Sequence, residues 1–501
     1  MTTNKKKMSF PSAITVLFIV LILAAVMTYL VPAGSYSKMI YDADANLFRI
    51  TDPSGTVTEM SPTQESLDEL GITGNLEKFL DGSIYKPVAV PGSYEKVEQQ
   101  PQGFFETLLA PISGVYETID IILFVFIIGG IIGVLNHMGA FSAGIGALSK
   151  ITKGKEFILI MFITILIAAG GTTFGLAEET IALYPIMVPI FLAAGYDVIT
   201  CIAAIYLGSC IGTMFPTINP FSAGIASNAA GISMADGMGF RAIGLVVGIV
   251  LTLAYILIYA KKVRKNPEKS LCYDQLEHHK EKYCYKGEVP KFTVRMKISL
   301  AVFGLTFAVL VWGLVSKQWW FDSMTMLFLA CGILLAFTTG IPEKEYVSQF
   351  IAGAADLMGV ALVVGIARAV NILLENGLVS DTILNFFSNG IAGMNPIIFI
   401  ILMMLVFIVL GFFINSSSGL AVLSIPIMAP LASTVGVSRS AIISAYCYGL
   451  GLISFITPTG LILATLAMVD VPFNKWLKFV LPLMGIITGA SAILLVIQVL
   501  V

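Results

Sequence analysis

Two polar clusters interrupt otherwise apolar stretches of this sequence, and a pair of prolines follows each of them. The first cluster lies in TTFGLAEETIALYPIMVP (residues 172–189) and the second in INSSSGLAVLSIPIMAP (residues 414–430). Hydroxyl and amide side chains, with backbone carbonyls freed at a helix break, are suitable ligands for a hard cation such as Na⁺. Helix N-termini facing the same space favour an anionic group. These residue types predict a binding site for a small charged solute.

Two further clusters follow downstream, in YLGSCIGTMFPTINP (residues 206–220) and YGLGLISFITPTG (residues 448–460). Proline and glycine end helices, and non-helical backbone at membrane depth is tolerated only where protein or a water-filled cavity receives it. The alternative is that Ser, Thr and Gly here serve only close packing between helices. Four clusters in matching positions favour the binding-site interpretation.

Three ionisable residues lie inside apolar sequence, where charges are costly and usually functional. Glu178 and Glu179 follow the first cluster, and Arg368 lies in the middle of an apolar stretch. The structural alternatives are helix capping for the glutamates and an ion pair with a neighbouring acid for Arg368. Adjacent glutamates diverge by ~100° on a helix, which suits a cavity wall better than a catalytic pair. An intramembrane hydrolase would need a nucleophile with a partner at depth, so we expect no enzyme.

The composition indicates an integral membrane protein. Of 501 residues, 57% are hydrophobic and 12% are charged, and the mean hydropathy is +0.90. Residues 36–100 contain eleven Asp/Glu against five Lys/Arg, whereas residues 261–297 contain eleven Lys/Arg against five acids. Because Lys and Arg accumulate in cytoplasmic loops, the first segment is expected outside and the second inside. Lys5, Lys6 and Lys7 predict a cytoplasmic N-terminus. We expect no nucleic-acid partner.

Apolar runs of about 20 residues, each long enough to cross a bilayer, recur along the chain. We predict nine full spans, at about 12–32, 119–138, 198–230, 240–260, 298–315, 323–341, 357–376, 439–470 and 475–500. Residues 157–194 and 396–435 are predicted as re-entrant hairpins because the polar clusters divide them. This count places the C-terminus outside.

The two hairpins belong to longer similar segments. PIMVPIFLAAG (185–195) matches PIMAPLASTVG (426–436), about 241 residues apart, with an odd number of crossings between them. Inverted repeats with interrupted helices are typical of secondary transporters that bind solute at the midplane. The expected organisation is a first span (1–33), an acidic outer loop (34–103), repeat 1 (104–260, broken span 198–230), a basic linker (261–297), scaffold spans (298–342) and repeat 2 (343–501, broken span 439–470).

This organisation resembles the ion transporter superfamily and, within it, the YfcC family of the C4-dicarboxylate anaerobic carrier (DcuC-like) group. The similarity rests on VPAGSYSK (31–38), the pair GTTFGLAEET/NSSSGLAV and the pair FPTINP/TPTG, and it extends over nearly the whole chain. It implies an all-α polytopic, elevator-type transporter, a homodimer, and Na⁺ or H⁺ as coupling ion without another cofactor. It implies Na⁺ near Asn415, Ser417, Thr457 and Thr217, with Pro216 also lining a break. The expected solute-binding residues are Thr172, Thr173, Glu178, Glu179, Asn219, Arg368, Asn415, Ser416, Ser417, Ser418, Thr457, Pro458 and Thr459.

The charged residues bear on the substrate. A dicarboxylate needs two positive or donor-rich ends, and the sequence offers a single central Arg. A basic amino acid needs one group that binds its carboxylate and one anionic pocket for its side chain. Arg368 or the N–H groups at the hairpin tips provide the first, and Glu178 and Glu179 provide the second. We therefore expect a secondary transporter of the bacterial cytoplasmic membrane for basic amino acids, by arginine/ornithine exchange or uptake. The alternatives are a C4-dicarboxylate carrier and, more remotely, a channel.

Overall fold

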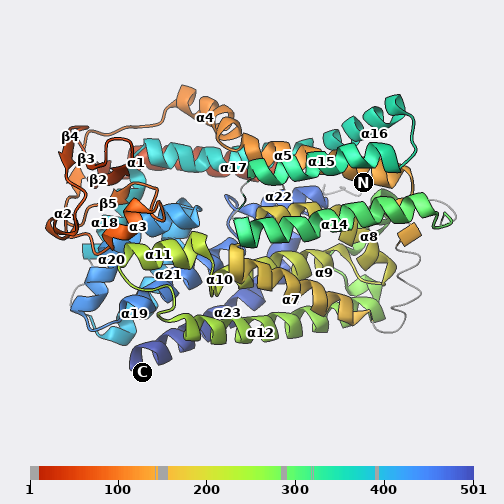
Figure 1. Ribbon diagram of the computed structural model, residues 1–501. Helices are drawn as coiled ribbons and strands as arrows, with labels where there is room; N and C mark the ends of the chain where they lie inside the picture. The colour runs from red at the N-terminus through yellow and green to blue at the C-terminus, as the bar shows by residue number, and fades with distance from the viewer. Residues whose placement is uncertain are drawn as a thin grey trace, which may run out of the picture.

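The computed structural model describes residues 11–141, 143–144, 156–283, 290–317, 319, 321–389 and 394–501. Lys5, Lys6 and Lys7, used above to orient the N-terminus, lie outside this range, as do six residues of the basic linker (284–289). The long helices run along one axis of the molecule (Figure 1). Many apolar side chains point outward from them, including those of Leu30 and Phe337, as a lipid-facing surface requires.

Within the described ranges, nine helices are long and apolar enough to cross a membrane. They are α1 (Ala13–Leu30), α5 (Ile119–His137), α7 (Phe157–Phe174), α12 (Met238–Lys265), α15 (Phe321–Thr338), α17 (Met358–Asn376), α19 (Pro396–Phe413), α20 (Ser417–Thr434) and α23 (Phe473–Leu500). Beside α15 runs α14 (Val294–Lys317).

These nine helices are not the nine expected spans. Helices α7, α19 and α20 come from the stretches predicted as re-entrant hairpins, while the expected spans at 198–230 and 439–470 are divided into shorter helices. At 1.5 Å per residue, the 18 residues of α7 reach about 27 Å, close to the thickness of a bilayer core. Length alone therefore does not distinguish a re-entrant arm from a full crossing.

Proline-containing stretches divide the two interrupted helices. The first comprises α9 (Val198–Ile202), the π-helical η2 (Ala203–Leu207) and α10 (Gly208–Met214), and resumes as η3 (Pro220–Gly224) and α11 (Ile225–Ala229). The second comprises α21 (Arg439–Ser454) and α22 (Leu461–Met468). The residues between, 215–219 and 455–460, are not helical. We call them break 1 and break 2.

Two reciprocal helix crossings organise the upper layer in Figure 1. Helix α4 (Phe104–Glu117) packs on α17, and α16 (Glu343–Asp356) packs on α5, which follows α4 in the chain. Both crossings depend on glycine: a Cβ on Gly114 would lie 2.1 Å from the Gly365 carbonyl oxygen, and one on Gly133 would lie 2.7 Å from that of Gln349. The backbones therefore touch directly.

Residues 34–96 form a small β domain, so the all-α expectation is wrong for this part of the chain. Its four-stranded antiparallel sheet has the order β4-β3-β2-β5, and β1 pairs with β6. Alternating buried residues such as Met39, Phe48 and Ile50 provide the core, against which Phe79 packs. The elements are β1 (Gly34–Ser35), β2 (Lys38–Asp42), β3 (Leu47–Thr51), β4 (Val57–Met60), β5 (Val88–Ala89), β6 (Glu95–Lys96), α2 (Gln64–Glu69) and α3 (Leu76–Leu80).

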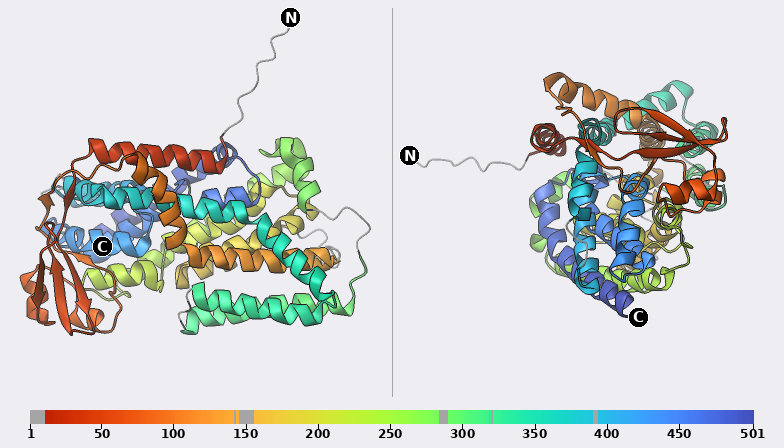
Figure 2. Two further views of the ribbon diagram at one scale, coloured as in Figure 1. Left: turned by 90° about the horizontal axis from the view of Figure 1, so that it is seen from above. Right: turned by 90° about the vertical axis from the view of Figure 1, so that its left-hand side faces the viewer.

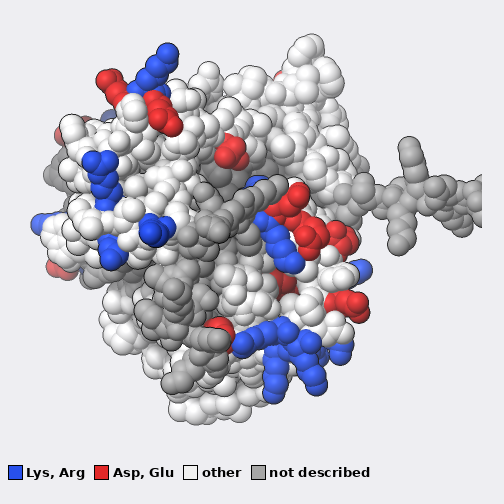
Figure 3. Space-filling view, turned by 90° about the vertical axis from the view of Figure 1, so that its right-hand side faces the viewer, with Lys and Arg blue, Asp and Glu red and all other residues white. Residues whose placement is uncertain are grey.

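The β domain sits at one end of the long axis, where α1 and α23 end (Figures 1 and 2). It packs on α18 (Val379–Asn389). The buried Asp381 of α18 accepts hydrogen bonds from the Tyr36 backbone N–H at 3.1 Å and from the Ser35 hydroxyl at 3.2 Å. At the other end, Lys and Arg side chains gather beside acidic ones (Figure 3). That end holds the last turn of α12, η4 (Pro267–Lys269), η5 (Tyr273–Gln275) and α13 (Leu276–Tyr283).

Candidate functional site

A cavity of about 800 Å³ lies between the β domain, α17, the two polar clusters and the two breaks. Of the expected site residues, it is lined by Glu178, Glu179, Asn219, Arg368, Asn415, Ser416, Ser417, Ser418 and Thr459. Thr172, Thr173, Thr457 and Pro458 are not among its lining residues, nor are Pro216 and Thr217. Of these, Thr457 contacts the lining residue Thr459 through its hydroxyl.

The turn after α7, which we call tip 1, begins at Gly175 and so lies later than Thr172 and Thr173, where the sequence suggested it. Thr172 and Thr173 remain in the last turn of α7, because the Thr173 hydroxyl donates back to the Ala169 carbonyl at 2.7 Å. The chain leaves the helix at Gly175, whose φ of +77° is the left-handed conformation that glycine adopts readily. The turn then enters the 3₁₀-helix η1 (Glu178–Leu183) and α8 (Tyr184–Ala193).

The last turn of α7, just before tip 1, is hydrogen-bonded to break 1. The Thr172 hydroxyl donates to the Phe215 carbonyl at 2.7 Å, and the Thr217 backbone N–H donates to the Thr172 hydroxyl at 3.0 Å. The Asn219 amide donates to the Gly171 carbonyl at 3.1 Å. These bonds supply partners for backbone groups that the break removes from the helix.

The turn between α19 and α20 (residues 414–416), which we call tip 2, is likewise hydrogen-bonded to break 2. The Asn415 amide donates to the Thr459 carbonyl at 3.1 Å, and the hydroxyls of Thr457 and Thr459 lie 2.9 Å apart. Ser416 caps α20 by accepting from the Gly419 N–H at 3.1 Å. The residues expected to bind Na⁺ lie in two different places. Asn415 and Thr457 both contact Thr459 in the second half, whereas Thr217 contacts Thr172 in the first half.

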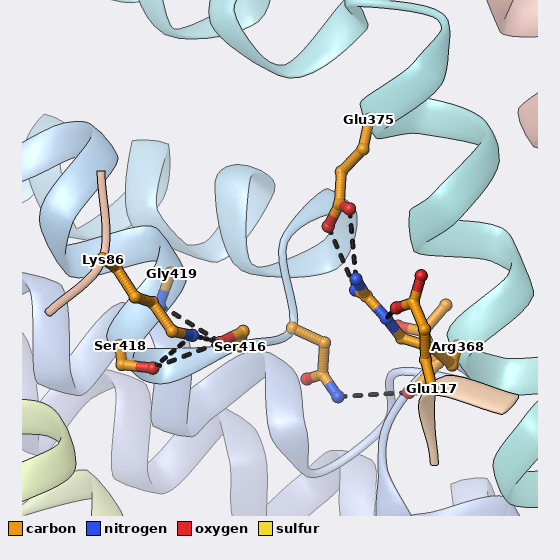
Figure 4. A network of polar contacts seen from close by, with 9 residues as sticks. Lys86, Glu117, Arg368, Glu375, Ser416, Ser418 and Gly419 are labelled. Atoms are coloured by element: carbon orange, nitrogen blue, oxygen red, sulfur yellow. Dashed lines mark hydrogen bonds and ion pairs between the residues drawn. The ribbon is translucent and has the colours of Figure 1, made fainter. Parts of the chain in front are cut away.

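Arg368 is bound by two carboxylates. Its Nε lies 2.6 Å from Glu117, and its two terminal nitrogens lie 3.0 and 3.1 Å from the oxygens of Glu375 (Figure 4). The ion-pair alternative for Arg368 therefore describes its geometry. One guanidinium and two carboxylates carry a net charge of −1, so this group offers no surplus positive charge to a solute.

Glu178 and Glu179 both face the cavity and are half-buried. Glu179 accepts a hydrogen bond from the Ala177 backbone N–H at 3.1 Å, as a capping carboxylate would. Over the described ranges, neither glutamate lies within 4.0 Å of a Lys, Arg or His nitrogen. Their carboxyl groups are therefore open to a cation or a proton in the cavity.

Two basic residues at the site were not anticipated from the sequence. Lys86, in the β domain, donates to the hydroxyl of Ser418 at 2.8 Å and to that of Ser416 at 3.4 Å (Figure 4). Arg241, in the first turns of α12, is fully buried and donates to the carbonyl of Pro216 in break 1 at 2.9 Å. The outer loop had no assigned role, and Arg241 lies at the edge of an expected span, so neither residue stood out as intramembrane.

Comparison with known proteins places the chain among carriers. Residues 10–500 match the DcuC family model, described as C4-dicarboxylate anaerobic carrier. A Haemophilus influenzae protein of uncharacterised function is 45% identical over 99% of this chain and 98% of its own length. A protein of Escherichia coli K12, provisionally named basic amino acid antiporter YfcC, is 27% identical over 98% of this chain and 96% of its own.

Two solved transporter structures are similar at a lower level. The Alcanivorax borkumensis YdaH transporter is 14% identical, with a TM-score of 0.40 over 97% of this chain and 98% of that one. MtrF of Neisseria gonorrhoeae, reported as illuminating a class of antimetabolite efflux pumps, is 16% identical, with a TM-score of 0.39 over 99% and 96%. The family model matches residues 10–500, nearly the entire chain, and the chain therefore belongs to the DcuC family of C4-dicarboxylate anaerobic carriers.

Proposed function

We propose that this protein is a secondary active transporter of basic amino acids, exchanging or importing arginine and ornithine across the bacterial cytoplasmic membrane. The observation that supports this most is the cavity between the two tips and the two breaks, which presents Glu178 and Glu179 without an ion-pair partner among the described residues. A cationic side chain that enters the cavity stabilises the ionised form of these carboxyl groups, whereas an anionic side chain is repelled by it.

The electrostatics of the rest of the cavity agree with this proposal. Arg368 is neutralised by Glu117 and Glu375, and Lys38 lies 3.9 Å from Asp381. A dicarboxylate would have to displace one of these carboxylates or pass the two glutamates. The provisional name of the Escherichia coli relative points to the same class of solute.

A C4-dicarboxylate remains the second candidate. The family description names that substrate, and Lys86 brings one ammonium group to the second tip. Because a dicarboxylate requires a second cationic partner and Arg368 is already bound, this candidate fits the geometry less well.

For the mechanism, we propose alternating access by an elevator-like displacement of an inverted repeat. The reciprocal pairing of α4 with α17 and of α16 with α5, and the matching fastening of each tip to a break, support a two-fold relationship between the halves. We further propose a homodimer with Na⁺ or H⁺ as coupling ion, and an orientation with the β domain and C-terminus outside and the N-terminus inside.

The test uses purified protein in liposomes loaded with ornithine or succinate, and measures uptake of labelled arginine and labelled succinate with and without a Na⁺ gradient. We expect arginine uptake driven by internal ornithine, and its loss in E178Q or E179Q. The exposed linker residue Glu277 provides the control E277Q, which should leave uptake unchanged.

Two other results would replace this proposal. Succinate uptake that ignores E178Q and E179Q but disappears in R368Q would establish the dicarboxylate carrier. Flux that neither saturates nor accelerates with solute on the opposite side would indicate a channel.

A further inference from the structure

Lys86 reaches the transport cavity from outside the helical bundle. It precedes β5, whose pairing with β2 (Met39 opposite Val88) fixes this stretch against the sheet, and β5 packs against α20. The Lys86 side chain lines the cavity and ends at the hydroxyls of Ser416 and Ser418, the first residues of α20 (Figure 4). A residue of the β domain is therefore part of the wall of the solute cavity.

Among the residues that the structure describes, the charge of Lys86 has no counter-ion. Around the cavity, the Arg368 guanidinium has two carboxylate partners and Lys38 has Asp381, whereas no carboxylate of the described residues lies within 4.0 Å of the Lys86 ammonium. Its hydrogen-bond partners are two neutral hydroxyls, and the centroid of the Tyr85 ring lies 5.9 Å from the ammonium. Half-buried charge is normally paired, because removing it from water is costly. Burial, followed by the nearby charge of Arg368, lowers the pKa of Lys86, consistent with an uncompensated cation.

Lys86 lies at the N-terminus of helix α20, where a positive charge without a counter-ion is especially unfavourable. Ser416 is the N-cap of the 18-residue helix α20, and Ser418 lies in its first turn. The N-terminus of a helix carries partial positive charge and favours anions. An ammonium there is unfavourable on its own, but the ammonium and the helix N-terminus together form a complementary setting for a carboxylate.

We propose that Lys86 is a specificity-determining residue that binds the carboxylate of the transported solute, while the cationic end of the solute lies toward Glu178 and Glu179. This inference rests on the proposal that the solute has a carboxylate, and it assigns to Lys86 the role that the sequence had suggested for Arg368.

The experiment measures binding of arginine and of agmatine, which is arginine without its carboxylate, to the purified full-length protein by calorimetry. In K86M we expect arginine to bind roughly 10-fold more weakly, because a charged hydrogen bond contributes on the order of one decade in affinity. Agmatine should bind equally to both proteins. K86R should retain arginine binding, and K78M, at an exposed lysine in the β domain, is the matched control.

The remaining outcomes are decisive in either direction. Unchanged arginine affinity in K86M would reduce Lys86 to a docking contact. Tighter binding of both ligands would make it a tethered cation that competes with the solute; either result overturns the proposal. If the wild type binds succinate instead, and K86M loses it, the role of Lys86 stands while the basic amino acid proposal fails. Should K86M not fold, K86Q removes the charge but keeps a donor for the serines, with the same expectation.

Discussion

The side-chain amide of Asn415 donates to the backbone carbonyl of Thr459 at 3.1 Å, which joins the second tip to the second break across 44 residues of sequence. In the first half, Asn219 makes the matching bond to Gly171, but there the asparagine belongs to the break and the carbonyl to the last turn of α7 before the tip. In both halves an asparagine amide thus links the helix break to the segment beside it, but the asparagine lies in tip 2 in one half and in break 1 in the other.

The Asn415 bond leads to the first prediction. Removing it in N415A costs about 1 kcal/mol of local stabilisation, equivalent to roughly a 5-fold change in an equilibrium constant. Because we propose Na⁺ near Asn415, the Na⁺ concentration that half-saturates uptake should rise by about that factor. Asn389, exposed in α18, supplies the control N389A. Uptake that is independent of Na⁺ in all three proteins would exclude Na⁺ as the coupling ion.

The Arg368 cluster gives a second prediction. R368Q leaves Glu117 and Glu375 facing each other without their common cation, yet both carboxylates are about half exposed, so the loss of stability should be limited to about 1–2 kcal/mol. Thermal unfolding in detergent should show a drop of a few degrees, while arginine affinity changes little. R49Q, at an exposed ion pair of the β domain, is the comparison. Loss of arginine binding in R368Q but not in R49Q would show that Arg368, and not Lys86, binds the carboxylate of the solute.

Arg241 is expected to matter more for stability than Arg368. It is fully buried and donates to the carbonyls of Pro216, Met234 and Asp236, so R241M leaves three backbone acceptors without their donor. Because a buried acceptor left without its donor costs about 1–3 kcal/mol, a total loss of about 3–5 kcal/mol is expected. K262M, at an exposed lysine farther along α12, should behave as wild type in the same unfolding measurement. Equal melting temperatures for the two variants would refute this account of break 1.

The glycine crossing between α4 and α17 can be tested with alanine alone. G114A places a methyl group 2.1 Å from the Gly365 carbonyl oxygen, so the helices must separate, with an expected cost of about 1–3 kcal/mol. G359A, in the same helix as Gly365, meets nothing within 4 Å. It should be neutral or slightly stabilising because alanine favours the helix. Melting temperatures of the pair give the comparison directly, and a similar value for both would contradict direct backbone contact.

A pH profile follows from the lowered pKa of Lys86, which faces Arg368, Glu375, Tyr85 and the two serines. Carboxylate binding needs the ammonium form, so arginine affinity should fall as pH rises through this lowered pKa, below the range of an ordinary lysine. Titration of the ligand affects all variants alike. K86R stays charged throughout and should lack this component of the fall. Parallel profiles for wild type and K86R would remove Lys86 from the binding step.

Part of this architecture is accessible from the sequence because proline and glycine act locally. Pro216, Pro220 and Pro458 lack a backbone N–H, and the helices are interrupted at 215–219 and 455–460 beside them. Thr172 and Thr173 misled the placement of the first tip because a threonine hydroxyl can bond back along its own helix, as Thr173 does to Ala169. The polar residues continue the helix, and Gly175 ends it.

Other features depend on distant contacts that no local pattern records. Lys86 and Glu117 meet the cavity residues Ser418 and Arg368 only after the chain folds, across more than 200 residues of sequence. The β domain was missed because its strands have two to five residues each, too short for alternation to stand out in an acidic loop.

The docking of the β domain on Asp381 also limits how the protein can be re-engineered. Replacing residues 34–96 by a short linker would remove the Ser35 and Tyr36 donors and leave a buried carboxylate unsatisfied, at the same time as it removes Lys86 from the second tip. The domain is therefore not an interchangeable module. Chimaeras between relatives should exchange it together with α18 and the start of α20, so that each buried charge travels with its partner.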